Sequence, residues 1–201
     1  MTELLGVILA GGQASRMGGG DKSLLPLAGK RVIDHVLERL RPQVTAMALN
    51  ANGDPERFAE FNLPVVADSV AEFPGPLAGV LAGLDWAAER GAKYILTVAA
   101  DTPFFPMDLQ VRLEQARLAA DLPIALAATQ GPGKLYRHPT FGLWPVALRE
   151  DLRQALALGL RKVVLWTDQH GTAEALFPSD YFDPFFNINM PEDLVKAEAM
   201  Q

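Results

Sequence analysis

Two cations and five glycines lie close together directly after the first apolar segment of this 201-residue chain. That segment, residues 4–9, has the length and density of a strand that is buried on both faces of a parallel sheet. It leads into a glycine-rich loop, residues 10–22, that contains Arg16 and Lys22. Free backbone N–H groups and fixed positive charge are what proteins use to receive phosphate oxygens. The loop is therefore predicted to bind a nucleotide; a flexible glycine loop is the alternative interpretation.

The spacing within this loop differs from that of the commonest phosphate-binding motif. A P-loop reads G-x-x-x-x-G-K-[ST], whereas Asp21 precedes Lys22 here. The chain instead carries the pattern L-A-G-G-x-x-x-R-M-G-x-x-D-K over residues 9–22. This pattern resembles the signature of nucleotidyltransferases that activate sugar phosphates or cofactors with a nucleoside triphosphate.

Polar residues also follow three later apolar segments: Asn50 after residues 45–49, Asp68 after 64–67 and Asp101 after 94–99. An ionised aspartate at the end of a buried strand is costly unless it is solvated, caps a turn or is paired with a cation. Mg²⁺ binds one or two carboxylates together with phosphate oxygens. Asp101 is thus a candidate magnesium ligand, with an N-cap role as the alternative.

A proline- and glycine-rich turn, residues 74–79, leads into a predicted helix. The free N–H groups of a helix start can meet an anion or the edge of a nucleobase. Gly75 and Gly79 are interpreted as positions where a ligand approaches the backbone, and an ordinary helix start is the alternative. For Asn52 and Gly53, simple turn chemistry competes with a binding role.

The elements that must position these residues alternate between strands and helices. The five apolar segments predicted as strands are residues 4–9, 45–49, 64–67, 94–99 and 124–128. Helical periodicity or start signals mark residues 32–40, 55–61, 77–90, 109–120, 146–158 and a last helix from Pro191. Residues 161–170 fit a strand or a helix, and a helix is favoured. This alternation predicts a Rossmann-like, doubly wound α/β fold with a mainly parallel sheet, helices on both faces and ligands at the strand ends.

Composition limits the classes of function. The net charge of −6 and the isoelectric point near 5.1 argue against a general nucleic-acid binder. The absence of cysteine excludes disulfides, thiolate metal sites and cysteine nucleophiles. No segment approaches the apolar length of a membrane span, so a cytoplasmic protein without membrane contact is expected.

Several motifs, in order along nearly the whole chain, resemble those of the molybdenum cofactor guanylyltransferase family. They are Leu9-Ala10-Gly11-Gly12, Asn50-Ala51-Asn52, Asp68, Gly75-Pro76-Leu77-Ala78-Gly79, Asp101-Thr102-Pro103, Arg137-His138-Pro139-Thr140 and residues 186–194. The resemblance implies a single nucleotide-diphospho-sugar transferase-like domain, residues 1–201. It implies a nucleotide-binding part of about residues 1–105 and a pterin-side part of about residues 106–201. The implied reaction transfers GMP from GTP to molybdopterin and releases pyrophosphate.

The resemblance also implies roles for individual residues. The GTP-binding positions are Leu9, Ala10, Gly11, Gly12, Lys22, Asn50, Asp68 and Asp101. Arg16, Lys22 and Asp101 would be catalytic, with Mg²⁺ on Asp101, and His138, Asn187 and Asn189 would line the pterin side. A buried or capping histidine and a turn before the last helix are the alternatives for the pterin-side residues. Molybdoenzymes, their chaperones and molybdenum-insertion proteins are further expected partners.

One position departs from the family pattern N-x-N-T-P-E-[DE]-L, because Met190 replaces the threonine. Methionine is a poor N-cap, so the last helix is expected to fray at its start and to hold Asn187 and Asn189 less firmly.

Three competing functions stay open on the sequence. The first is a cytidylyltransferase of the same cofactor, which typically has P-A-A-G in the first loop and lacks Leu77, so both positions favour guanine here. The second is a sugar-1-phosphate nucleotidyltransferase. The third is a protein that binds GTP and delivers the cofactor without turnover.

Overall fold

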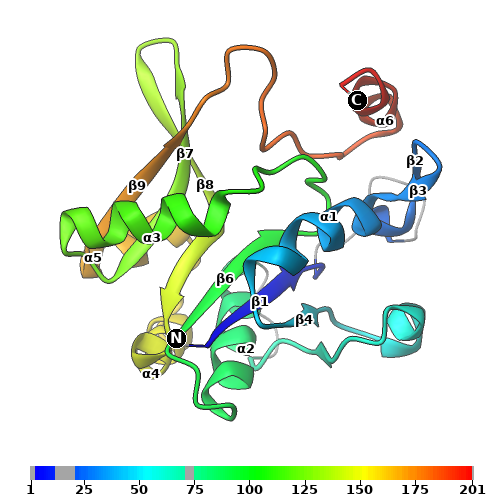
Figure 1. The fold of residues 1–201 in the computed structure, drawn as a ribbon. Helices are drawn as coiled ribbons and strands as arrows, with labels where there is room; N and C mark the ends of the chain where they lie inside the picture. The colour runs from blue at the N-terminus through cyan, green and yellow to red at the C-terminus, as the bar shows by residue number, and fades with distance from the viewer. Residues whose placement is uncertain (1–2, 12–20, 71–74, 201) are drawn as a thin grey trace.

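A seven-stranded sheet, in the order β5-β4-β1-β6-β8-β7-β9, forms the centre of the molecule (Figure 1). The computed structural model describes residues 3–11, 21–70 and 75–200. The strands are β1 (Leu4–Leu9), β4 (Ala46–Asn50), β5 (Val65–Val66), β6 (Tyr94–Ala99), β7 (Ile124–Gly131), β8 (Lys134–Pro145) and β9 (Thr172–Phe177). A separate antiparallel hairpin consists of β2 (Pro26–Leu27) and β3 (Lys30–Arg31).

The sheet is mainly parallel, as predicted. β5, β4, β1 and β6 pair in parallel, so their carboxyl ends meet at one edge. β8 is antiparallel to both of its neighbours, β6 and β7, and β9 is parallel to β7. The carboxyl end of β7 and the beginning of β8 therefore reach the same edge as the ends of β1, β4 and β6.

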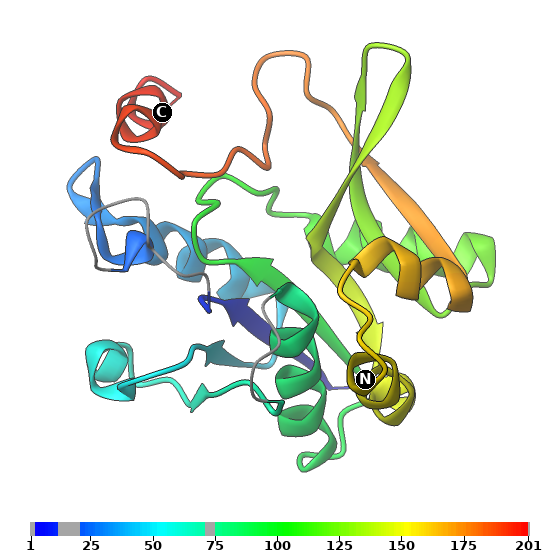
Figure 2. The same ribbon diagram turned by 180° about the vertical axis from the view of Figure 1, so that it is seen from behind.

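In the described residues, five α-helices cover the two faces of the sheet: α1 (Val32–Leu40), α2 (Pro76–Ala88), α3 (Leu109–Ala120), α4 (Arg149–Ala157) and α5 (Val163–His170). A further helix, α6 (Pro191–Glu198), packs beside β2 instead. Apolar residues of α1 and α3 pack in one buried cluster with Phe105, Phe141 and Phe185. Residues of α2, α4 and α5 pack in a second cluster on the opposite face, which is turned to the viewer in Figure 2. None of the helices in the described part of the chain combines the length and apolar character needed to cross a membrane.

Shorter helical segments of 3₁₀ type connect these elements: Lys22–Leu24, Arg41–Gln43, Pro55–Phe61 and Val146–Leu148. The segment 146–158, predicted as one helix, is thus a 3₁₀ turn followed by α4. Residues 161–170, for which the sequence favours a helix over a strand, contain helix α5.

The segment around His138 is part of β8. His138 pairs with Ala127 of β7, while Gly142 pairs with the preceding residue, Leu126. Residues 139–141 therefore form an irregularity in the strand, at which Pro139 has no N–H to donate. Before this bend, residues 134–138 of β8 pair only with β7. The two strands project there as a hairpin at the top of Figure 1.

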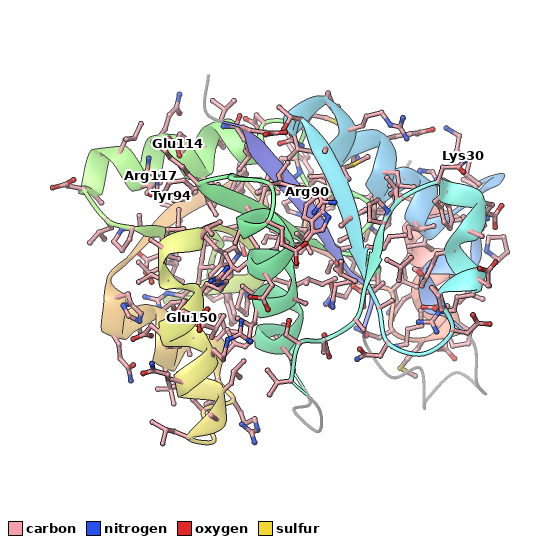
Figure 3. The ribbon with its side chains drawn as sticks, turned by 90° about the horizontal axis from the view of Figure 1, so that it is seen from below. Lys30, Arg90, Tyr94, Glu114, Arg117 and Glu150 are labelled. Carbon is pink, nitrogen blue, oxygen red and sulfur yellow. The ribbon has the colours of Figure 1, made fainter. Side chains whose placement is uncertain are left out.

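Charged and aromatic side chains fix α3 at the opposite end of the sheet. The Arg117 guanidinium lies 4.8 Å from the ring centre of Tyr94, at the beginning of β6, and donates to Glu114 one turn earlier in α3 (Figure 3). The pKa of Arg117 is raised, first by its hydrogen bonds to Glu114. These contacts anchor the helix away from the edge where the loops gather.

A small third cluster joins the two ends of the chain at the loop-bearing edge. It contains Leu27 of β2, Phe104, Ile188 and Ala197 of α6. The red helix α6 accordingly lies beside the blue β2–β3 hairpin in Figure 1. The chain thus returns to its amino-terminal part after leaving β9.

Candidate active site

The carboxyl ends of β1, β4 and β6 are joined by backbone hydrogen bonds where the predicted loops begin. The Ala10 N–H donates to the Asn50 carbonyl at 2.8 Å, and the Ala100 N–H donates to the Leu9 carbonyl at 3.1 Å. Ala10 is buried and Gly11 is exposed. Leu9, Ala10, Gly11, Asn50 and Asp101 therefore lie on three adjacent strand ends. Gly12 and Arg16 lie outside the described residues.

Asp68, after β5, is held by two asparagines at the end of β4, Asn50 within the strand and Asn52 after it. Its carboxylate accepts from the amide of Asn50 at 2.9 Å and from the amide of Asn52 at 2.7 Å. Its own N–H donates to the Asn52 side-chain oxygen at 2.9 Å. Asn50 is only 2% exposed and also donates to the Val66 carbonyl, whereas Asp68 is partly exposed. The structure thus brings Asn50 and Asp68 together and leaves a fixed carboxylate accessible to a ligand.

Gly79 has a different role from the one expected. A Cβ at this position would lie 2.2 Å from the Asn50 side-chain oxygen and 3.0 Å from a methyl carbon of Leu9. The space beside Gly79 is therefore filled by Asn50 rather than left for a ligand. Gly75 precedes α2 with φ +141°, a backbone conformation that requires glycine. Leu77 is almost fully buried in the core under α2, so its side chain does not face the site.

Asp101 follows β6 and is a partly buried carboxylate of the site. Burial raises its pKa, and the Thr102 hydroxyl and the charge of Lys22 oppose this rise. The hydroxyl of Thr102 lies 3.2 Å from a carboxylate oxygen of Asp101. A nearby cation would offset the hydration free energy that this carboxylate loses on burial.

Lys22 connects the amino-terminal loop with the carboxyl-terminal segment. It begins the 3₁₀ helix Lys22–Leu24, and its ammonium donates to the Asn189 side-chain oxygen at 3.3 Å. The preceding Asp21 forms an ion pair with Arg57 at 2.7 Å and accepts from the Ser23 hydroxyl. These two partners hold the end of the loop on which Lys22 lies.

The carboxyl-terminal segment carries Asn187 and Asn189 to the end of β6. The Ile188 N–H donates to the Asp101 carbonyl at 2.9 Å, and the Thr102 hydroxyl donates to the Asn187 side-chain oxygen. Both asparagines are more exposed than Ile188 between them, which is fully buried. In Figure 1 this segment runs between β9 and α6 past the end of β6.

His138 lies in an aromatic cluster beside the same segment. Its ring stacks on Phe185 with centres 4.2 Å apart, and its Nε2 lies 2.9 Å from the Thr129 hydroxyl. Burial lowers the pKa of His138, and the charge of Asp183 opposes this only partly. The ring is therefore neutral at pH 7, and it rests on Phe185, two residues before Asn187.

Sequence reasoning did not predict the side-chain contacts that support this site. Asn52 holds Asp68, Thr102 contacts both Asp101 and Asn187, and Phe185 supports His138. Asn52 and Thr102 lie within the motifs, but nothing in their spacing indicates which side chain each contacts. Within the described residues, no three His, Asp or Glu side chains gather to form a metal site from protein ligands alone.

With this fold, the chain matches a family of nucleoside-triphosphate transferases. Residues 6–172 match the family described as the MobA-like NTP transferase domain. Solved structures with similar folds include molybdopterin-guanine dinucleotide biosynthesis protein A from Archaeoglobus fulgidus, with a TM-score of 0.72 and 24% identity over 98% of this chain and 97% of that one. A CMP:2-keto-3-deoxy-manno-octonic acid synthetase complexed with CTP has a TM-score of 0.76 and 15% identity over 99% and 98% of the two chains. At these identities the likeness concerns the fold alone.

Sequence relatives narrow the class further. The molybdenum cofactor guanylyltransferase of Rhodopseudomonas palustris (strain BisB5) is 55% identical over 197 residues, which covers 96% of this chain and 92% of the relative. A protein of the same name from Mesorhizobium japonicum is 50% identical over 203 residues, covering 98% and 96%. The chain belongs to the molybdenum cofactor guanylyltransferase family, a family of nucleotidyltransferases.

Proposed function

We propose that this protein transfers GMP from GTP to molybdopterin, forming molybdopterin guanine dinucleotide and pyrophosphate. The observation that carries the proposal is the identity of 50% or more, over nearly the whole chain, to proteins named for guanylyl transfer. The partly exposed carboxylates of Asp68 and Asp101, which follow β5 and β6 at the same edge of the sheet, support the proposal.

The strand-end residues form the GTP site in this proposal. Leu9, Ala10, Gly11 and Gly12 supply the loop against which the nucleotide lies, Asn50 and Asp68 stand beside it, and Lys22 supplies positive charge for the phosphates. The carboxylate of Asp68 accepts hydrogen bonds, and the Watson–Crick edge of guanine presents two neighbouring donors. Cytosine presents one donor beside an acceptor, so a carboxylate favours GTP over CTP.

The reaction requires positioning rather than proton transfer. The terminal phosphate monoester of molybdopterin attacks the α-phosphorus of GTP, a new P–O bond forms, and the bond to the bridging oxygen breaks as pyrophosphate leaves. A phosphate dianion is already a nucleophile, so no general base is assigned. Lys22 and Arg16 stabilise the charge that develops on the leaving group.

The chemistry of Asp101 fits Mg²⁺. A carboxylate is a hard oxygen ligand, and Mg²⁺ needs only one or two of them because substrate phosphates complete its shell. When bound there, the ion supplies neutralisation of phosphate charge. Asp101 holds this position through the contact of its side chain with Thr102 and of its carbonyl with Ile188.

The carboxyl-terminal segment and the β7–β8 hairpin form the pterin side. A neutral His138 and the amides of Asn187 and Asn189 offer the hydrogen bonds that a pterin ring requires. Molybdoenzymes and the proteins that insert molybdenum are the partners that would receive the product. The division into a nucleotide part, residues 1–105, and a pterin part, residues 106–201, follows from this assignment.

A panel of nucleoside triphosphates with molybdopterin as acceptor tests the proposal. Pyrophosphate release and dinucleotide formation are expected with GTP and not with CTP, and Asp101→Asn serves as the inactive control. Turnover with CTP in place of GTP would favour the cytidylyltransferase alternative. Binding of GTP without pyrophosphate release would favour a delivery protein.

A further inference from the structure

We infer that Thr102 is a positioning residue that anchors the carboxyl-terminal segment, residues 186–189, to the end of β6. Its side chain is fully buried between the two halves of the site. Its hydroxyl lies within hydrogen-bond distance of both the Asp101 carboxylate and the Asn187 amide oxygen. Thr102 is thereby a side chain through which the proposed GTP half contacts the proposed pterin half.

The hydroxyl is the specific part of this contact. One hydroxyl carries one proton, so Thr102 donates to Asp101 or to Asn187 at any moment, and its lone pairs remain available as acceptors. Because Thr102 and Asp101 lie in a largely buried region, losing the hydroxyl leaves polar atoms without a partner there. An apolar side chain of the same shape would fill the space but would not replace the hydrogen bond.

Three further contacts show that the segment is fastened at this point. The Ile188 N–H donates to the Asp101 carbonyl, and the Ile188 side chain packs in the small cluster with Leu27 and Phe104. Asn189 receives a hydrogen bond from Lys22. Asn187 itself is not buried, so its amide is held by Thr102 on one side and accessible to a ligand on the other.

The consequence for function rests on the proposed transfer of GMP to molybdopterin. If Asn187 and Asn189 contact the acceptor, the Thr102 hydroxyl sets their position relative to Asp101. Its loss should then weaken molybdopterin binding and leave GTP binding nearly unchanged.

The test compares Thr102→Val, which keeps the shape and removes the hydroxyl, with Thr102→Ser, which keeps the hydroxyl and removes a methyl group. Hydrogen exchange of backbone amides 186–189 in the free protein reports the anchoring without any assumption about function. Exchange about tenfold faster in the valine variant is expected, the scale of one lost hydrogen bond, with little change in the serine variant. Equal exchange in the valine variant and the parent would overturn the inference.

A second set of variants protects the test against a folding defect of the valine variant. Asn187→Ala removes the other partner from a position that is not buried, and it should accelerate the same amides. The double variant should be no faster than the valine variant, because both changes remove the same contact between Thr102 and Asn187. Additive effects would overturn the assignment of a shared contact.

Binding measurements complete the experiment. The dissociation constant for molybdopterin should rise about tenfold in the valine variant and that for GTP should stay within about twofold. Equal weakening of both ligands would overturn the positioning role. If the parent itself does not bind molybdopterin, the proposed function fails while the exchange data still decide the anchoring.

Discussion

The charge of Asp101 destabilises the folded state, whereas the proposed chemistry requires it. Burial raises its pKa, so the folded protein holds this proton more tightly than the unfolded chain does. Between the ordinary pKa of 3.8 and the raised value, the folded state binds more protons, and stability from this group falls as the pH rises. At neutral pH the charged side chain is therefore a cost to the fold, as is common for functional residues.

Replacing Asp101 by asparagine should separate these two effects. At pH 7 we expect Asp101→Asn to unfold at a higher denaturant concentration than the parent, and this difference should shrink as the pH falls through the raised pKa toward about 3.8. Activity should fall by roughly 10²–10³, the scale of a lost electrostatic contribution to catalysis. Denaturant melts at both pH values and initial rates provide the measurement. A variant less stable than the parent at pH 7 would show that the carboxylate contributes to folding.

Gly11 and Gly79 form a matched pair for testing which glycine serves the ligand. A Cβ at Gly11 would lie 3.6 Å from the Asn50 oxygen, an ordinary contact, whereas one at Gly79 would lie 2.2 Å from the same atom. Gly11→Ala should leave the melting temperature unchanged and weaken GTP binding. Gly79→Ala should instead lower stability by about 1–3 kcal/mol, because Asn50 must move. Calorimetric titration with GTP and thermal melts of both variants distinguish the two roles, and a destabilised Gly11→Ala variant would contradict this division.

At the scale of single residues, the sequence predicted which side chains stand at strand ends but not what they contact. Asn50, Asp68 and Asp101 follow apolar segments that end at one edge of a parallel sheet, so their proximity is a consequence of topology. The contacts of Thr102 with Asn187 and of Lys22 with Asn189 join positions 85 and 167 residues apart. Such contacts depend on the path of the whole carboxyl-terminal segment.

Among the elements, the start of α6 shows how one side chain compensates for another. Met190 offers at best a weak acceptor, yet the Asp193 carboxylate accepts from the N–H groups of Asn189 at 2.9 Å and Met190 at 3.0 Å. These hydrogen bonds lower the pKa of Asp193, with the one from Asn189 as the largest cause. This half of a capping box holds the helix start and the adjoining Asn189 without a capping hydroxyl.

Met190→Thr should therefore stabilise the protein only modestly. The new hydroxyl can accept one N–H of the first turn, and we expect about 0.5 kcal/mol, the lower end of the value of a cap. Asp193→Ala should cost more, about 1 kcal/mol, because two N–H groups lose their acceptor. Urea unfolding of the two variants checks the order. A threonine variant that gains more than the alanine variant loses would show that α6 frays at its start in the parent.

Prediction of the strands succeeded where burial alone determines the pattern. The five apolar segments all form strands, because both faces of their part of the sheet are covered by helices. β8 was missed because it begins with charged and polar residues in the exposed hairpin and contains Pro139. β9 was missed because its burial alternates along an edge strand, and β2 and β3 because each is only two residues long.

Over the whole molecule, the proposed nucleotide and pterin parts share one sheet. β8, from the second part, pairs with β6 of the first part, and one buried cluster contains residues of α1, β6, β7 and β9. Neither part therefore has a complete core of its own, which supports the prediction of a single domain over residues 1–201.

Unfolding should accordingly be one cooperative transition. The three tryptophans, Trp86, Trp144 and Trp166, all lie in the cluster under α2, α4 and α5. Their fluorescence reports that face of the sheet, while far-ultraviolet circular dichroism reports all helices. Coincident transitions in urea are expected from both signals, because the sheet couples the two faces.

GTP binding gives a second test of the cooperativity between the two faces of the sheet. The candidate GTP loops lie at the strand ends, and a ligand that binds only the folded state stabilises the whole cooperative unit. At about 100 times its dissociation constant, GTP should raise the free energy of unfolding by about 2.7 kcal/mol in both signals. A shift in circular dichroism without an equal shift in tryptophan fluorescence would show that the GTP site and the tryptophan cluster do not unfold as one unit, which would contradict a single cooperative domain.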